Sequence, residues 1–341
     1  MLRRDFVDLS TKLVVAHLLG APQPRVRRSR DAAPGRREYV STLAPPYLDA
    51  HAHSASGLLL AYRAASGGPK SRESPADGVA LIRRMDADGV RQAFVLSTAY
   101  QMAADAYGTR TSESTEYARI RFENDFTADE CAQYADRLVP FLSVNPKRGY
   151  AVEEVDRCAE KKMRGLKLHL WNSLVDTRQA ADLAALRRVV ERAAHHRLAV
   201  VAHIFVGAVP NYGPDDTERF VREIIMPFDT LQISLAHLAG AGGFAAGPQV
   251  CFERLIALCG PDTPCASRVW TDMAATLIST TPPHEALRLG ELLPRWGLHR
   301  VLWGSDNIEG ALAFTRANWP LDATAWPPIA EQRGKPLVAG A

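Results

Sequence analysis

Short apolar runs alternate with helical patterns along most of this chain. Eight runs are rich in Val, Leu, Ile and aromatic residues, as expected for parallel strands that are buried on both faces. These predicted strands cover residues 47–53, 92–98, 139–145, 165–170, 199–205, 232–238, 268–274 and 300–306. Segments between them place apolar residues three and four positions apart, as in DLAALRRVVERAAHHR at 182–197, which is typical of an amphipathic helix. The pattern therefore predicts an α/β fold of eight strand–helix units.

Polar residues near the strand ends decide which α/β architecture fits. Strand–helix alternation allows either a closed (β/α)8 barrel or an open doubly wound sheet. Residues of metal-ligating type lie at or near the ends of five of the eight runs: His51, His53, His169, His203, His237 and Asp306. Strands so far apart in an open sheet would not converge, whereas barrel strands all end at one mouth. We therefore expect a single-domain (β/α)8 TIM barrel over residues 47–320.

The five residues outside strand 165–170 predict a metal site by their combination, since each alone has another interpretation. His51 and His53 are two positions apart on a strand, so their side chains face the same way. His203 or His237 alone would more often be a core residue, and Asp306 alone could cap the following helix. All five occupy one level of the predicted barrel, and imidazoles with a carboxylate are typical ligands of a catalytic metal.

Net charge is unevenly distributed along the chain. The net charge is +3, and 47% of the residues are apolar, which is ordinary for a globular enzyme. Residues 1–46 contain nine Lys/Arg and four Asp/Glu, which leaves the remaining body at about −2. A nucleic-acid surface would need a basic stripe on the folded domain itself, so we expect no nucleic-acid partner. No apolar run approaches the length of a membrane span, so we expect no stable membrane insertion.

The N-terminal arm, residues 1–46, permits two interpretations. Its opening MLRRDFVDLS followed by KLVVAHLLGAP resembles a twin-arginine export signal. Asp8 and His17 depart from that pattern, and a disordered basic arm with a short amphipathic helix is the alternative. The expected location is accordingly periplasmic by twin-arginine export or cytoplasmic. Residues 22–46 are rich in Pro and Arg and predict a linker, and prolines in residues 321–341 predict a short irregular tail.

Five sequence pieces, taken together, resemble the amidohydrolase superfamily, and most closely the metal-dependent TIM-barrel hydrolases called amidohydrolase family 2. The pieces are LDAHAH, GLKLH, VVAHIF, SLAHLAGAGG and VLWGSD, in that order, and the resemblance extends over about residues 47–320. It implies that His51, His53, His203 and Asp306 bind one divalent metal ion, with Zn²⁺ preferred. It also implies that His237 polarises or protonates the substrate, while Asp306 takes a proton from the attacking water.

The strand at 165–170 leaves two alternatives for its lysine. Lys167 could be carboxylated and bridge two metal ions, as in some superfamily members. It could instead be a buried lysine that is paired with a carboxylate such as Asp49 or Asp272, which we favour together with a single ion. The candidates for substrate binding are His169, Lys167, Trp171 and Asn172. Substrate identity is expected to depend on loops at 54–76, 99–114, 171–178 and 206–215.

Other motifs favour simpler explanations. The glycine-rich segment 238–247 lacks the GxGxxG spacing of a dinucleotide loop. Ser305 lacks the GxSxG context of a hydrolase nucleophile. Five cysteines show no CxxC spacing, and we favour reduced thiols over a disulfide between Cys259 and Cys265.

The predicted activity is hydrolysis of a small carbonyl compound, an amide or a lactone, by a metal-activated water. The alternative within the same family is a non-oxidative decarboxylase or hydratase of a small carboxylic acid. A decarboxylase would need a cation for the substrate carboxylate, and Arg110, Arg148 and Arg316 are the candidates. A catalytically inactive ligand-binding barrel is the other class, although no ligand position is missing. The expected partner is a small-molecule substrate, and a homo-oligomer is suggested only by analogy with relatives.

Overall fold

The computed structural model describes residues 43–66, 76–108, 111–207, 209, 211–334 and 337–338. The predicted export signal lies outside these residues, so the location of the protein stays a prediction. Among the described residues, no helix combines the length and the apolar character that crossing a membrane requires.

Eight parallel strands form the centre of the fold, and each of them pairs with the next strand in the chain. The strands are β1 (Leu48–His53), β2 (Gln92–Leu96), β3 (Leu138–Ser143), β4 (Gly165–His169), β5 (Ala199–His203), β6 (Ile233–Leu235), β7 (Val269–Asp272) and β8 (Val301–Leu302). Ala50 N of β1 donates to Trp303 O just after β8, at 2.8 Å. The first and last strands therefore lie side by side, and the predicted (β/α)8 barrel is confirmed.

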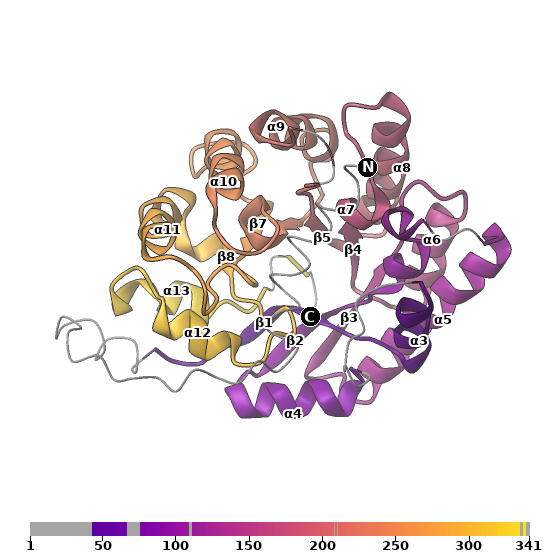
Figure 1. The fold of residues 1–341 in the computed structure, drawn as a ribbon, viewed down its shortest axis with the longest axis horizontal. Helices are drawn as coiled ribbons and strands as arrows, with labels where there is room; N and C mark the ends of the chain where they lie inside the picture. Colours follow the sequence, from indigo (N-terminus) through magenta and orange to yellow (C-terminus); the bar gives the residue numbers. More distant parts are fainter. Residues whose placement is uncertain are drawn as a thin grey trace.

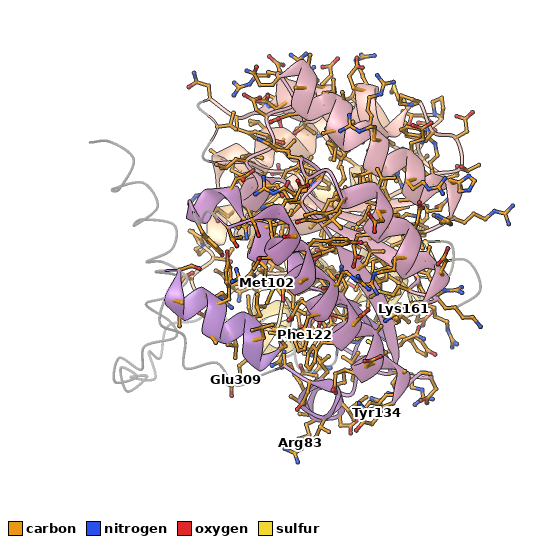
Figure 2. All side chains as sticks on the ribbon, turned by 90° about the vertical axis from the view of Figure 1, so that its right-hand side faces the viewer. Arg83, Met102, Phe122, Tyr134, Lys161 and Glu309 are labelled. Carbon is orange, nitrogen blue, oxygen red and sulfur yellow. The ribbon has the colours of Figure 1, made fainter. Side chains whose placement is uncertain are left out.

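Helices surround the strands (Figure 1). They are α3 (Gly57–Ala65), α4 (Gly78–Asp88), α5 (Glu113–Ala132), α6 (Ala151–Glu160), α7 (Leu170–Ser173), α8 (Ala180–His195), α9 (Pro214–Phe220), α10 (Ala246–Cys259), α11 (Pro283–Trp296), α12 (Ala311–Ala317) and α13 (Pro327–Ala330). Figure 2 shows the side of the barrel that carries α5, where Phe122 remains 49% exposed. Helix α3 lies within a segment expected to be a loop, and Ser56 begins it by accepting a hydrogen bond from Leu59 N.

Two apolar layers hold the barrel together. One layer lies between the strands and the helices. The other fills the barrel interior, since its members come from six strands: Leu48, Ala50, Phe94, Leu96, Val139, Phe141, Ala199, Val201, Trp270 and Leu302. Each fully buried Leu or Phe contributes about 1.5–3 kcal/mol. Gly165 is required in this layer, because a Cβ there would lie 2.1 Å from Cε1 of Phe141.

A bulge in β1 directs its histidines toward the interior. The pairing register with β2 shifts between Asp49 and Ala52. Ala50 belongs to the interior layer, whereas Ala52, two positions later, packs in the layer against the helices. The bulge therefore changes which residues of the strand face the barrel interior. Bulges commonly redirect side chains in this way next to a functional site.

Seven of the eight strands end before the predicted residue, and β6 and β8 end earliest relative to the prediction, by three and four residues. β6 ends at Leu235, and His237 follows it in the left-handed region with φ 54°. β8 ends at Leu302, and Asp306 has φ 51°. Residues other than glycine adopt this conformation at a free-energy cost, and they are enriched at functional sites. The two predicted catalytic residues therefore lie on turns that follow the strands.

The C-terminal segment packs against the end of the barrel at which the strands begin. Leu337 and Val338 pack against the interior layer. Trp326 is 1% exposed, and its indole N–H donates to Ala44 O at 2.8 Å. This part of the predicted tail therefore contributes to the core. All five cysteines, including Cys259 and Cys265, are buried free thiols.

Candidate metal centre

His51 is oriented by a carboxylate on β7, which is separated from β1 only by β8. Its Nδ1 lies 3.0 Å from Oδ2 of the fully buried Asp272 on β7. Because an ionised carboxylate only accepts hydrogen bonds, the proton of the ring is on Nδ1. The lone pair of Nε2 therefore faces the barrel mouth, where Lys167 Nζ lies 3.0 Å away. Burial lowers the pKa of His51 well below its ordinary value, and the charge of Lys167 lowers it further.

His53 and His237 are held in the same tautomer by backbone carbonyl groups. His53 Nδ1 lies 3.1 Å from Leu96 O, and His237 Nδ1 lies 2.7 Å from Ala274 O. A carbonyl oxygen can only accept, so each ring donates from Nδ1. Both Nε2 atoms are left for a metal ion or a proton. Such outer partners fix the orientation and raise the basicity of metal-ligating histidines.

Asp306 brings a carboxylate to the two histidines of β1. Its Oδ1 lies 3.2 Å from His53 Nε2 and 3.8 Å from His51 Nε2. Gly304 permits this approach, because a Cβ there would lie 2.6 Å from Cβ of His51. Burial by itself raises the pKa of Asp306, but the hydrogen bond with His53 and the neighbouring His51 and His237 hold it below its usual range. The carboxyl group is therefore ionised.

The imidazole of His203 is suited to bind a cation. Its Nε2 is buried and has no hydrogen-bond partner among the described residues. Its ring centroid lies 5.0 Å from that of His237. A buried polar atom without a partner costs about 1–3 kcal/mol. Coordination of a cation would remove that cost.

The donor atoms fit one divalent ion. His51, His53 and Asp306 form one group whose ligand atoms lie within 4.8 Å of one another, and His51, His237 and Asp272 form a second. Tetrahedral ligands at the bond lengths of zinc are roughly 3.3 Å apart, close to the 3.2 Å between His53 Nε2 and Asp306 Oδ1. The structure therefore brings together three of the four predicted ligands. The fourth, His203, adjoins them through His237 and lies outside both groups.

Lys167 does not form the predicted contact with a carboxylate. Its Nζ lies 3.0 Å from His51 Nε2, while Asp49 accepts from His51 N at 3.0 Å and from Ser305 N at 2.9 Å. Burial lowers the pKa of Lys167 to about 8, against the opposing charges of Asp272 and Asp306. The lysine is thus buried, as favoured, but its hydrogen-bond partner is an imidazole.

His169 has the opposite tautomer from His51, His53 and His237. Its Nδ1 accepts from Asn172 N at 3.3 Å, so the proton of the neutral ring is on Nε2. The ring stacks between Tyr100, with centroids 4.7 Å apart, and His203, with centroids 4.3 Å apart. His169 is therefore oriented as a hydrogen-bond donor. Trp171, on α7, lies against Gly207, beyond β5.

Sequence reasoning missed two residues of this site. Asp272 was considered only as a partner of Lys167, and its contact with His51 crosses 221 positions of the chain. Tyr100 follows β2 in a short 3₁₀ segment, η1 (Ala99–Ala103). In the sequence, Tyr100 could be noticed only as an aromatic residue in the loop at 99–114, which was expected to line the substrate pocket.

The arginines suggested for a substrate carboxylate are not gathered at the site. Arg148 donates to Glu116 Oε1 and to Asp105 Oδ1, both at 2.8 Å. Arg316 is on α12 outside the barrel, and Arg110 lies outside the described residues.

A groove of about 620 Å³ is lined by Tyr47 and Trp326 at the start of β1, the opposite end from the histidines.

Comparison with known proteins decides the family. The family model described as amidohydrolase matches residues 48–337, most of the chain. The chain belongs to the amidohydrolase family. This confirms the resemblance seen in the sequence. No curated protein matches this amidohydrolase significantly in sequence.

Solved structures share the fold of this amidohydrolase at low sequence identity. A probable 2-pyrone-4,6-dicarboxylic acid hydrolase from Acinetobacter baumannii is 15% identical and has a TM-score of 0.55. The matched region covers 85% of this chain and 98% of that hydrolase, and the coverages below are given in the same order. A 5-carboxyvanillate decarboxylase from Sphingomonas paucimobilis is 16% identical with a TM-score of 0.56, covering 84% and 97%. A dihydroxybenzoic acid decarboxylase from Polaromonas sp., with bound manganese and 2-nitroresorcinol, is 14% identical with a TM-score of 0.57, covering 86% and 97%. At these identities the likeness shows the fold.

Proposed function

We propose that this amidohydrolase is a metal-dependent hydrolase that cleaves a small carbonyl compound, an amide or a lactone. The observation that carries the proposal is the convergence of donor atoms at the barrel mouth. His51, His53 and His237 all direct an Nε2 atom away from a fixed Nδ1 hydrogen bond, and Asp306 adds an ionised carboxylate. His51 Nε2 lies 3.0 Å from Lys167 Nζ and His53 Nε2 lies 3.2 Å from Asp306 Oδ1, and a bound divalent ion would replace these contacts with bonds to the same nitrogen and oxygen atoms.

We assign the ion to His51, His53, His203 and Asp306, and we expect one ion per chain. Three imidazoles and one carboxylate suit Zn²⁺. Manganese is bound in the Polaromonas decarboxylase, so Mn²⁺ is the second ion to test. The buried Nε2 of His203 supports its inclusion in the ligand set.

The side chains around the ion divide the proton transfers between them. A divalent ion supplies Lewis-acid catalysis and makes water acidic enough to react near neutral pH. Asp306 is ionised and accepts the proton of the attacking water. His237 accepts at Nε2 in its neutral form, because Nδ1 is committed to Ala274 O. A proton that this Nε2 takes from solvent is donated to the leaving group, and the proton held by Asp306 returns to solvent. His169 donates a hydrogen bond from Nε2 to a substrate oxygen.

Non-oxidative decarboxylation of a small carboxylic acid is the second candidate. Two of the similar structures above are decarboxylases of aromatic acids. The donor orientation of His169 serves a carboxylate oxygen as well as a carbonyl oxygen. Hydration and a catalytically inactive barrel remain further alternatives, and the complete ligand set argues against the inactive form.

A substrate screen that follows two products separates these reactions. Protein loaded with Zn²⁺ or Mn²⁺ would be incubated with lactones including 2-pyrone-4,6-dicarboxylate, simple amides, dihydroxybenzoates and 5-carboxyvanillate. Hydrolysis of a lactone releases acid without CO₂, whereas decarboxylation releases CO₂ and consumes a proton. Metal-dependent acid release or amide cleavage supports the hydrolase. Release of CO₂ alone would replace it with the decarboxylase.

Replacing His169 with Phe is expected to lower kcat/KM by about 10- to 100-fold, because a hydrogen bond to a charged oxygen is worth about 1.5–3 kcal/mol. Phe preserves the stack between Tyr100 and His203, so metal content should not change. His284→Phe on the exposed start of α11 is the matched control. Steady-state kinetics would check this result. An unchanged kcat/KM would mean that His169 only packs.

A further inference from the structure

The junction between the first and last strands carries two of the proposed metal ligands but little regular pairing. β8 contains only Val301 and Leu302. Beyond it, Asp306 N donates to His51 O at 2.7 Å. The position of His53 relative to Asp306 therefore depends on contacts outside a strand ladder.

One side chain supplies the missing pairing at His53. Asn307 Oδ1 accepts from His53 N at 2.9 Å, and Asn307 Nδ2 donates to His53 O at 2.7 Å. Both backbone groups of His53 are thus satisfied by one amide, as a neighbouring strand would satisfy them. The orientation of the amide is determined, because the backbone N–H requires an oxygen and the carbonyl requires an N–H.

The local backbone makes asparagine suitable here. Asn307 has φ 56°, and asparagine adopts this left-handed region more readily than most residues. Asn307 N donates to Ser305 Oγ at 3.2 Å, which holds the turn. The side chain is thereby directed back across 254 positions of the chain to His53.

We propose that Asn307 is a positioning residue that holds His53 against Asp306 as a preformed pair of metal ligands. The inference rests on the proposed metal site. His53 is fixed twice, by the Asn307 amide at its backbone and by Leu96 O at ring Nδ1. The other ring nitrogen of His53, Nε2, is thereby held 3.2 Å from Asp306 Oδ1. A residue that only formed the turn would not need the amide, since glycine also adopts this φ.

Two substitutions separate the amide from the turn. Asn307→Gly keeps the backbone conformation and removes the amide, while Asn307→Asp keeps the size and replaces the donor with an oxygen that faces His53 O. Asn318→Asp is the matched control, because Asn318 is partly buried at the end of α12 and its amide donates to Phe314 O, at 2.9 Å, within its own helix.

The measurement is the affinity of the full chain for Zn²⁺ and Mn²⁺, by competition with a chelator, together with the visible absorption spectrum of the Co²⁺-loaded protein. Loss of an outer partner of a metal ligand typically weakens binding 10- to 100-fold. We expect a loss in that range for both Asn307 variants, a changed Co²⁺ spectrum, and no change for Asn318→Asp. Circular dichroism would establish that each variant is folded.

The outcomes distinguish this inference from the proposed reaction. Metal affinities of folded Asn307→Gly and Asn307→Asp within a factor of about three of the parent, with an unchanged Co²⁺ spectrum, would reduce Asn307 to a turn residue. Absence of metal uptake by the parent chain would overturn this inference and the proposed function together. Tight metal binding that depends on Asn307, without hydrolysis of any substrate, would sustain the inference and reject the hydrolase.

Discussion

Asparagine in place of Asp306 is expected to lower kcat by about 10³-fold while the fold is kept, because a positioned general base contributes about 10²–10⁴-fold. The amide matches the carboxylate in size but cannot accept the proton of the attacking water. Asparagine also tolerates φ 51° at this position, so backbone strain does not add to the effect. Single-turnover and steady-state rates, with metal content measured on the same preparation, would check this prediction.

The control for this substitution is Asp215→Asn on α9, where the carboxylate is 88% exposed and lies 3.5 Å from Arg254. It should leave kcat unchanged. Asp306→Asn with bound metal and an undiminished kcat would show that Asp306 is a ligand but not a base. Loss of metal along with activity would place its main contribution in coordination.

Removing both histidines of β1 is expected to abolish stoichiometric metal binding. His51→Ala with His53→Ala deletes two of the four proposed ligands, and His51 belongs to both candidate ligand groups. We expect the affinity to fall by more than about 100-fold, the upper end of the loss for an outer partner of a ligand. Elemental analysis of protein purified without chelators, followed by titration with Zn²⁺, would measure it.

The surface pair His195→Ala with His196→Ala is the matched control, since it removes two adjacent histidines from the end of α8. The His51 substitution also leaves buried Asp272 without its imidazole partner, which costs about 1–3 kcal/mol of stability. His53→Ala alone avoids that cost and should still weaken binding. Full metal occupancy in the folded double variant would reject the assigned site.

The local sequence pattern predicts which strands exist more accurately than where they end. All eight predicted strands exist, because burial on both faces selects apolar β-formers wherever such a strand occurs. Their ends were less accurate at His237 and Asp306, which leave the strands in left-handed turns. Helix α3 was missed, since its start depends on the Ser56 cap within a segment assigned to a loop. The prolines at 327–328 begin the short α13.

The sequence by itself determined the barrel and the metal-ligating residue types, because strand patterns are local and strand ends in a barrel converge. Only the tertiary structure decided which nitrogen of each imidazole is free. Asp272, Leu96 O and Ala274 O select the tautomers of His51, His53 and His237, and these partners lie on other strands or follow them. The placement of Lys167 against His51 was decided in the same way. Hydrogen-bond partners 37 to 221 positions apart leave no periodic trace in a single sequence, because each pairing depends on side-chain direction after the barrel has closed.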